Sequence, residues 1–376
     1  MKLYIDCVGC EQRQLDTQRI MNYSQRNRID LVNSPSISDY AIIVTCAVDS
    51  STEKASLSKI KQISRELSGK GKLIIGGCLP SISPKELTQY DVYHTFSPRN
   101  MKTLDSIFQS KYPMSSIKIP SRSVFDSKRK YGEGLTFKEE YDSAKHGFKV
   151  VINQGCLGSC SYCAIRYATG KLASRPLEDV VEQVKDGITQ GEETVMLMGG
   201  DTGAYGRDIG IKFPALLKEL ISLHEYKLYI HDFGVNWLIR DFEEHLEVLE
   251  QNKNNPRIRV INFPIQSGSD RVLKLMRRAY KSDEVRRTLT KVKDSYPSLG
   301  IGTHVIIGFP SETETDFIST LRLLENIDFD FITCFPYSEH ELTDSASIPD
   351  KIGDDTIEKR LEKISETLGN KVKIIR

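Results

Sequence analysis

Three cysteines stand within eight residues in the stretch "GCLGSCSYCAIRY". Cys156, Cys160 and Cys163 follow directly on an apolar run, "KVVINQ", which is typical of a strand. Structural zinc sites require four ligands and usually contain paired C-x2-C units, so three thiolates in one loop fit zinc poorly. Iron–sulfur clusters take cysteine thiolates as ligands, and three of them leave one iron of a four-iron cluster open to a substrate. We therefore interpret the loop as a cluster site, rather than as three unrelated cysteines.

A second set of cysteines is spread along the N-terminal part of the chain. Cys10, Cys46 and Cys78 each lie at or just beyond the end of a predicted strand, after "KLYIDCV", "YAIIVT" and "KLIIGG". The carboxyl ends of parallel strands share one sheet edge, where ligands bind. From these residues alone two interpretations stay open. The three thiols form a second cluster site, or they are buried thiols, because free cysteine is among the most buried residue types.

The composition is that of a globular protein long enough for two domains. The chain has 376 residues, of which 27% are charged and 39% hydrophobic. The apolar runs are too short to span a bilayer and no signal peptide begins the chain, so we expect a cytoplasmic protein without a membrane partner. Because the cytoplasm is reducing, eight cysteines at short spacings favour metal binding or catalysis over disulfides. The net charge of +1 requires any nucleic-acid contact to use local basic patches.

The order of predicted elements indicates an α/β protein. The first hundred or so residues alternate between strands and helices, which predicts a mostly parallel sheet. A polar stretch without sustained periodicity follows and is typical of a connector. A second alternation then contains six predicted strands, which favours a partial (β/α)6 barrel, and one charged amphipathic helix ends the chain. We expect an α/β domain over 1–112, a linker over 113–146, a (β/α)6 core over 147–340 and a helical tail over 341–376.

Several motifs resemble one enzyme family. The cysteine loop, in the context "GCLGSCSYCAIRYATGKLASRP", has the spacing of the radical S-adenosylmethionine (SAM) superfamily. The stretches "GCEQRQLDTQ", "TCAVDSSTEKASLSKI" and "GGCLPSISP" are similar to the three cysteine motifs of the methylthiotransferase N-terminal domain. With "MGGDTGAYGRDIG", "FPIQSGSDRVLKLMRRAY" and "VIIGFPSETETDF", the resemblance to radical SAM methylthiotransferases covers nearly the whole chain. It implies a Rossmann-like N-terminal domain followed by a TIM-type partial barrel.

The resemblance also implies the cofactors. A 4Fe–4S cluster on the Cys156 loop would bind SAM and cleave it to a 5′-deoxyadenosyl radical, and an auxiliary 4Fe–4S cluster on the N-terminal cysteines would deliver sulfur or a methylthio group. Two departures stand out: Arg13 replaces the asparagine usual in the first motif, and Cys7 could exchange ligand roles with Cys10. The candidate ligands are Cys10, Cys46 and Cys78 for the auxiliary cluster and Cys156, Cys160 and Cys163 for the other. The candidate SAM-binding residues are Tyr162, Arg175, Gly199, Gly200, Asp201, Gln266 and Ser267.

The implied reaction inserts sulfur and a methyl group at an unactivated C–H bond. The favoured substrate is C2 of N6-threonylcarbamoyladenosine 37 in tRNA, because "DTGAYGRDIG" resembles the subgroup that acts on it. No RNA-binding TRAM module is expected after the tail, so a protein side chain, such as an aspartate of a ribosomal protein, is the alternative. An iron–sulfur electron carrier without catalysis is a third hypothesis, which the "MGGD" and "QSGS" stretches oppose. Expected partners are a reducing flavodoxin or ferredoxin and a sulfur donor.

Basic residues gather in two places. We expect one helix after "FPIQSGS" to carry several of them toward the barrel mouth, where some could face phosphates, and the connector holds a further basic run. Both sets could equally be solvated. The helix set is Arg271, Lys274, Arg277, Arg278 and Lys281; the connector set is Arg122, Lys128, Arg129 and Lys130; and Arg166 follows the cysteine loop. Cys334 is expected to be a plain buried thiol.

Overall fold

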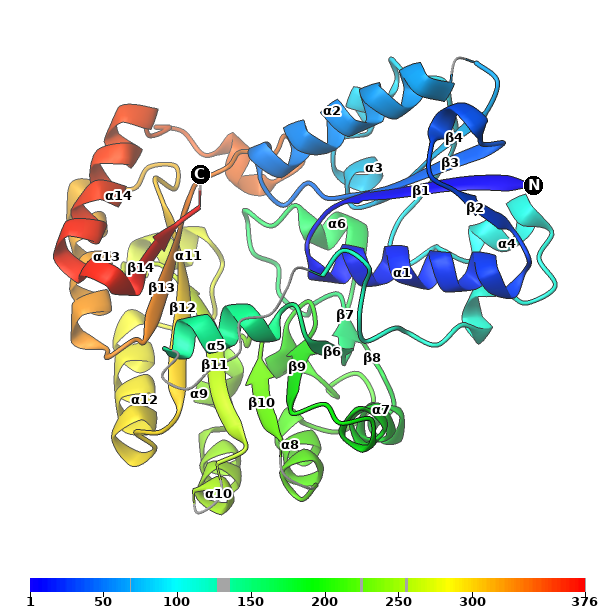
Figure 1. Ribbon diagram of the computed structural model, residues 1–376. Helices are drawn as coiled ribbons and strands as arrows, with labels where there is room; N and C mark the ends of the chain where they lie inside the picture. The colour runs from blue at the N-terminus through cyan, green and yellow to red at the C-terminus, as the bar shows by residue number, and fades with distance from the viewer. Residues whose placement is uncertain (68, 127–135, 224–225, 254–255, 376) are drawn as a thin grey trace. The chain divides into compact units, whose positions relative to one another are not determined.

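The computed structural model describes residues 1–67, 69–126, 136–223, 226–253 and 256–375 (Figure 1). The chain forms two compact units. The first contains Met1–Lys128 and Ala164–Gly170, and the second contains Arg129–Cys163 and Lys171–Arg376. The short helix directly after the cysteine loop therefore belongs to the first unit. Within the described ranges no helix is both long and apolar enough to cross a membrane.

The first unit is built on a five-stranded sheet in the order β2-β1-β3-β4-β5, and all of its pairings are parallel. The central strand β3 reads "YAIIVT" because side chains on both of its faces are buried, which removes the polar alternation of a solvated strand. The strands are β1 (Lys2–Val8), β2 (Asp30–Val32), β3 (Tyr40–Thr45), β4 (Lys72–Gly77) and β5 (Val92–Phe96).

Helices cover both faces of this sheet. Helices α1 and α4 supply Ile20, Tyr23 and Leu104 to the apolar core on one face. On the other face α2 and α6 supply Ile60 and Ala168, and α3 packs beside them. The helices are α1 (Glu11–Arg26), α2 (Ser50–Leu67), α3 (Leu79–Ile82), α4 (Thr103–Phe108) and α6 (Ile165–Thr169).

The second unit contains a seven-stranded parallel sheet in the order β14-β13-β12-β11-β10-β9-β6. Its first six strands in the chain are those predicted, and the predicted fold class is confirmed. The seventh, β14, corrects the prediction that the tail would hold only a helix: it pairs with β13, with Ile332 opposite Val372. The strands are β6 (Phe148–Val151), β9 (Thr194–Met198), β10 (Lys227–Ile230), β11 (Ile258–Gln266), β12 (Gly300–Ile307), β13 (Phe331–Pro336) and β14 (Val372–Ile374).

The outer face of this sheet packs against helices that follow its strands. Val180, Leu216 and Leu321 are among the helix side chains in this core. The helices are α7 (Leu177–Thr189), α8 (Phe213–Ile221), α9 (Val235–Arg240), α10 (Phe242–Asn252), α11 (Asp270–Leu275), α12 (Ser282–Ser295), α13 (Glu314–Asn326) and α14 (Asp354–Leu368). Two short antiparallel strands, β7 (Asn153–Gln154) and β8 (Ala173–Ser174), flank the cysteine loop.

The inner face is covered at one level by a helix within the segment expected to be a connector. Helix α5 (Phe137–Ala144) begins with a capping box between Thr136 and Glu139 and lies across β9 and β11 (Figure 1). Tyr141 is 1% exposed and packs with Phe331 and other inward-facing strand residues. The basic residues Lys128, Arg129 and Lys130 lie outside the described residues.

Candidate functional site

The sheet of the first unit places the three N-terminal cysteines at neighbouring strand ends. Strands β1, β3 and β4 are adjacent and parallel, and Cys10, Cys46 and Cys78 follow their carboxyl ends. Cys46 and Cys78 are 1% and 3% exposed, whereas Cys10 is exposed. Ser56 holds the Cys46 turn, because its hydroxyl donates to the Cys46 carbonyl over 2.8 Å. Gly77 has φ +94°, and a Cβ there would lie 2.1 Å from the Thr45 carbonyl oxygen, so glycine is required before Cys78.

The three thiols interact with one another. Cys46 lies close enough to both Cys10 and Cys78 for the side chains to interact, and this interaction is the main cause that raises the pKa of Cys46. The same interaction lowers the pKa of Cys10 to about 6 and also lowers the pKa of Cys78. Three cysteine side chains gathered at one sheet edge are the donor set that an iron–sulfur cluster needs.

Cys7 lies differently from Cys10. Its side chain is on the β1 face that packs with Leu3 and the α1–α4 core. Burial is the main cause that raises its pKa to about 12. The side chain that interacts with Cys46 is that of Cys10. The geometry therefore favours Cys10 over Cys7 as the third ligand.

In the second unit the loop of Cys156, Cys160 and Cys163 follows β7. A Cβ on Gly158 would lie 3.3 Å from the Cys156 sulfur and 3.7 Å from the Cys160 sulfur, so these two sulfurs flank one point of the backbone. The Gly158 N–H donates to the Cys156 sulfur over 3.1 Å. Burial and, to a smaller extent, the nearby Asp201 carboxylate together raise the pKa of Cys156 to about 12.

The second half of the loop is fixed by α11 and its C-terminal turn. Ser161 donates its hydroxyl to the Leu275 carbonyl over 2.7 Å and its N–H to the Met276 carbonyl over 3.2 Å. Arg278 donates to the Cys160 sulfur over 3.4 Å. Tyr162, predicted to lie beside adenine, packs edge-on against Phe309 with ring centroids 6.5 Å apart.

The glycine pair after β9 is needed for backbone packing within the protein. A Cβ on Gly199 would lie 2.2 Å from Asn153 Oδ1, and one on Gly200 would lie 2.4 Å from the Gly155 carbonyl oxygen. The Asn153 side chain accepts from the Gly200 N–H and donates to the Asp201 carbonyl. These bonds tie the end of β9 to the strand that precedes the cysteine loop.

The Asp201 carboxylate is also engaged within the protein. It accepts from the Gly234 N–H over 2.9 Å and from Trp237 Nε1 over 2.7 Å, and it lies 3.8 Å from the Cys156 sulfur. Burial raises its pKa, against the opposing effect of these two donors. Asp201 therefore links α9 to the first cysteine of the loop.

The remaining candidate SAM residues are placed in different surroundings. Gln266 ends β11 with φ +68°, a left-handed conformation that is uncommon for a residue with a side chain. Ser267 is 1% exposed, and its hydroxyl is 3.2 Å from that of Thr320 on α13. The Arg175 guanidinium donates to the Val151 carbonyl over 3.0 Å and to Gln183 Oε1 over 2.5 Å, which joins β6 to α7.

The basic stretch after β11 is not one helix, and its arginines have protein partners. Helix α11 ends at Leu275 and α12 begins at Ser282, so Arg277 and Arg278 lie in the connection between them. Arg271 pairs with Asp316, and Arg277 pairs with Asp344. Arg278 turns toward Cys160 and the Pro264 carbonyl. In the first unit, Arg166 stacks on the neighbouring Tyr167 ring.

A polar layer inside the barrel was not singled out from the sequence. It is formed by His231 and Asp232, which follow β10, and by Asn262 and His304, which lie in the middle of β11 and β12. His231 Nδ1 is 2.9 Å from Asp232 Oδ2, and Asn262 Nδ2 is 3.1 Å from Asp232 Oδ1 and 3.0 Å from His304 Nε2. Asn262 is 0% exposed, and its Oδ1 has no hydrogen-bond partner among the described residues. Asp232 has φ +46°. Strained backbone and an unpaired buried acceptor are typical of binding sites.

The charge state of this polar layer follows from its contacts. Burial would raise the pKa of Asp232, but His231 and His304 outweigh burial and lower it, so the carboxylate is charged at neutral pH. Burial lowers the pKa of His304 to about 4, so its imidazole is neutral. The layer therefore presents hydrogen-bond acceptors. A short polar alternation along "KLYIHDF" and "IRVINF" is the sequence signal that could have indicated it.

Both cysteine trios have the chemistry of cluster ligands. Within the described ranges no set of three or more histidine, cysteine, aspartate or glutamate side chains is arranged to hold a single metal ion. In a four-iron cluster each thiolate binds a different iron, so its ligands do not have to surround one point. All eight cysteines are free thiols, and Cys334 is 0% exposed in β13, which confirms the prediction of a buried thiol.

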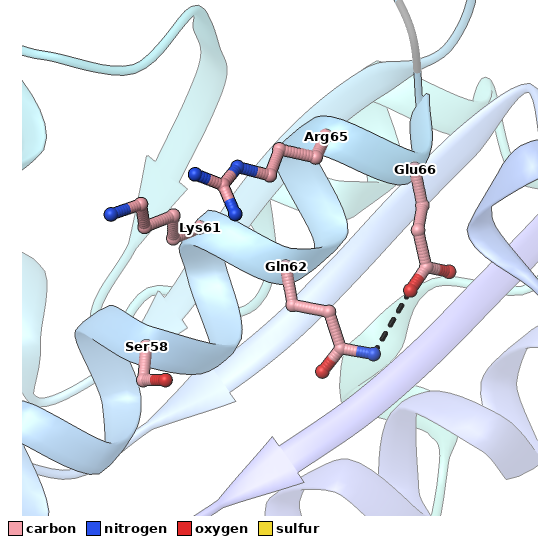
Figure 2. A pocket seen from close by; sticks show the side chains of 5 residues that line it. All are labelled: Ser58, Lys61, Gln62, Arg65 and Glu66. Carbon is pink, nitrogen blue, oxygen red and sulfur yellow. Dashed lines mark hydrogen bonds between the residues drawn. The ribbon is translucent and has the colours of Figure 1, made fainter.

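Two surface pockets are lined by residues other than the cysteines. One is lined by Ser58, Lys61, Gln62, Arg65 and Glu66, and Figure 2 shows these side chains on the exposed side of α2, with Gln62 donating to Glu66 over 2.9 Å. Another lies among α11, α12 and α13. Neither contains a cysteine, and we assign no chemistry to them.

Family models match both parts of the chain that contain the cysteine trios. The sequence family "Radical SAM superfamily" matches residues 150–324, and the sequence family "Uncharacterized protein family UPF0004" matches residues 2–96. The radical SAM methyltransferase TsrM from Kitasatospora setae shares the fold, with a TM-score of 0.63 over 92% of this chain and 77% of that chain, at 12% identity.

Curated relatives cover almost the whole chain. The threonylcarbamoyladenosine tRNA methylthiotransferase MtaB of Aquifex aeolicus is 28% identical over 97% of this chain and 87% of its own. The ribosomal protein uS12 methylthiotransferase RimO of Carboxydothermus hydrogenoformans is 28% identical over 97% of this chain and 82% of its own. The tRNA-2-methylthio-N(6)-dimethylallyladenosine synthase of Thermotoga petrophila is 28% identical over 91% of this chain and 76% of its own.

The parallel barrel sheet with its three-cysteine loop defines a radical SAM enzyme. The N-terminal unit with its second cysteine trio, together with relatives that span nearly all of the sequence, narrows this class. The chain belongs to the radical SAM methylthiotransferases.

Proposed function

We propose that this enzyme transfers a methylthio group to C2 of N6-threonylcarbamoyladenosine 37 in tRNA, in the cytoplasm. The observation that supports this substrate is the similarity to the Aquifex aeolicus tRNA methylthiotransferase over 97% of the chain, together with the "DTGAYGRDIG" stretch after β9. The base next to an anticodon is single-stranded, so it can be splayed into a pocket. A flavodoxin or ferredoxin would supply electrons, and a separate donor would renew the sulfur.

The chain's own residues divide the work between two cofactor sites. Cys156, Cys160 and Cys163 would hold the cluster that binds SAM, and the N-terminal trio would hold a second one. These two cofactors supply radical formation and sulfur when bound. Asp201 and Arg278 orient the first loop, because they contact the Cys156 and Cys160 sulfurs respectively.

The polar layer is our candidate for substrate contact. Active sites of barrel enzymes lie at the carboxyl ends of the strands. The Asp232 carboxylate and the unpaired Asn262 Oδ1 both accept hydrogen bonds, so they suit the N–H and O–H groups of a modified nucleoside. An Asp232→Asn variant should therefore lose substrate turnover and retain SAM cleavage in the absence of substrate.

Nucleoside mass spectrometry tests the substrate. tRNA from cells that lack the gene should lose 2-methylthio-N6-threonylcarbamoyladenosine, and the intact gene should restore it. A gene variant with Cys160→Ala should not restore it. Unchanged methylthio nucleosides would reject the tRNA proposal.

Cluster analysis tests the two cofactor sites. Anaerobically reconstituted protein should contain two 4Fe–4S clusters by iron and sulfide assay, and the Cys46→Ala, Cys78→Ala double variant should contain one. Dithionite and SAM should release 5′-deoxyadenosine from the wild type, and Cys160→Ala should abolish this release. A Cys334→Ala variant is the matched control, because that thiol is buried in β13 and belongs to neither trio.

A ribosomal protein is the second candidate substrate. The uS12 methylthiotransferase from Carboxydothermus hydrogenoformans has the same identity to this chain as the tRNA enzyme from Aquifex aeolicus, 28%, and matches the same share of it, 97%. If the tRNA nucleosides are unchanged, mass spectrometry of uS12 from the same two strains should show a methylthio group only where the gene is present. The non-catalytic electron carrier is no longer supported, because the family consists of enzymes.

A further inference from the structure

A buried arginine contacts the N-terminal cysteine trio. Arg13, in the first turn of α1, is 3% exposed. Its Nη1 lies 3.3 Å from the Cys78 sulfur, and its Nε lies 2.9 Å from Asp16 Oδ2. Its charge is also close enough to interact with Cys10 and Cys46. One guanidinium therefore faces three thiols on one side and a carboxylate on the other.

The backbone fixes this arrangement. A Cβ on Gly9 would lie 2.6 Å from the Arg13 Cβ, so glycine leaves the space that the arginine stem occupies. The Thr17 hydroxyl donates to the Arg13 carbonyl over 2.8 Å, within the helix. Arg13 is thus held beside the cysteines by its own helix rather than by a mobile loop.

Asp16 does not fully satisfy the guanidinium. The Arg13 Nε and the Asp16 Oδ2 form an ion pair, yet neither atom makes a hydrogen bond within the described residues. Leaving a buried donor unpaired is costly, and a buried charge is stable only if other charges compensate it. Negative charge on the nearby sulfurs would provide that compensation.

We propose that Arg13 is a positioning residue that compensates the charge of the auxiliary cluster and raises its reduction potential. This rests on the proposed function, in which Cys10, Cys46 and Cys78 hold that cluster. Three thiolates on a 2+ four-iron core give a net negative site, and one-electron reduction adds a further negative charge. A hydrogen bond to a ligand sulfur and a nearby positive charge both stabilise the reduced state. Asp16 opposes this effect in part.

The test is potentiometric titration followed by EPR on the full-length chain. The background is the Cys156→Ala, Cys160→Ala, Cys163→Ala variant, in which only the auxiliary cluster remains. In this background we expect Arg13→Leu to shift the potential to more negative values and Arg13→Lys to shift it less. Asp16→Asn should shift it to more positive values, because the guanidinium keeps its charge while the opposing carboxylate is lost.

Arg26→Leu is the matched control. It removes the same charge from the same helix, but Arg26 is exposed, stacks on Tyr112, and lies thirteen residues from Arg13, or about 20 Å along the helix. Its potential should equal that of the background. Equal potentials and EPR spectra for Arg13→Leu, Asp16→Asn and the background, at equal iron content, would overturn the inference.

Two other results are also decisive. Loss of iron in Arg13→Leu that Arg13→Lys restores would support the charge-compensating role, because lysine returns the positive charge, with N–H donors, that leucine lacks. A background protein without any cluster would instead refute the proposed function, since Cys10, Cys46 and Cys78 would then hold no iron whether or not Arg13 is present.

Discussion

We expect the Asp201 carboxylate, which lies beside the Cys156 loop, to contribute strongly to the stability of the folded protein. It accepts hydrogen bonds from the Gly234 N–H and from Trp237 Nε1. Asp201→Ala leaves both buried donors unpaired, and each costs about 1–3 kcal/mol, so unfolding should become easier by about 2–6 kcal/mol. Asp201→Asn keeps one acceptor oxygen and presents an N–H₂ group to the other donor, so its cost should be about 1–3 kcal/mol.

Tryptophan fluorescence measures this effect directly, because Trp237 is the only tryptophan in the chain. With a urea dependence of about 3 kcal/mol per molar, the midpoint should fall by about 0.7–2 M for Asp201→Ala and by about 0.3–1 M for Asp201→Asn. The native emission should also shift in Asp201→Ala, because the indole loses its acceptor. Glu182→Ala removes an exposed carboxylate from α7 and should change neither quantity. Equal midpoints for wild type and Asp201→Ala would refute the reasoning.

Three further outcomes follow from buried groups of the second unit. Arg360→Leu removes the cation from the fully buried Glu312 carboxylate and should cost about 3–5 kcal/mol in urea unfolding at pH 7.5, while adding Glu312→Gln should recover most of the loss. Burial raises the pKa of Glu312 to about 7. At pH values between the ordinary pKa of a glutamate and 7, the native state therefore binds more protons than the unfolded state, so the free energy of unfolding should fall as pH rises. Glu312→Gln should flatten this pH dependence. Burial would raise the pKa of Asp316, but hydrogen bonds from Arg271 and other donors outweigh burial and lower the pKa. The stability that the charged carboxylate contributes should therefore be lost on acidification below pH 4. The Asp316→Asn variant should be less stable than the wild type at neutral pH and should lose less stability in acid unfolding curves.

The sequence was sufficient to predict the two parallel sheets, because each buried strand is a short apolar run bounded by polar helices. It also predicted that Cys10, Cys46 and Cys78 follow neighbouring strand ends. Strand β14 could not be predicted, because "VKI" is short and follows a charged helix, and only its pairing with β13 makes it a strand.

Helix α5 left a signal that the surrounding polarity obscured. Phe137, Tyr141 and Ala144 have the i, i+4 and i+7 spacing of a buried helix face, and Thr136 with Glu139 forms the capping box at its start. The segment was interpreted as a connector because no longer periodic pattern accompanies it.

The Cys156 loop could be predicted from its local spacing and strand context, whereas the N-terminal trio needed the family resemblance as well. The contacts that surround the trios could not be predicted, because they join side chains of residues far apart in the chain. Arg13 meets Cys78 across 65 positions, and Asp201 meets Trp237 across 36. The stretch after β11 was expected to be a single helix, but Arg277, with φ +58°, interrupts it and directs Arg278 toward Cys160.

The apolar packing of α5 has a consequence for any radical chemistry above it. Tyr141 and Ala144 fill the space between Met196, Val260 and Phe331, so the base of the barrel is dry at that level. Among the described residues, packed side chains therefore close this level of the barrel beneath any radical formed at the opposite end. Bulk solvent is kept from that side by apolar side chains that take no part in the reaction.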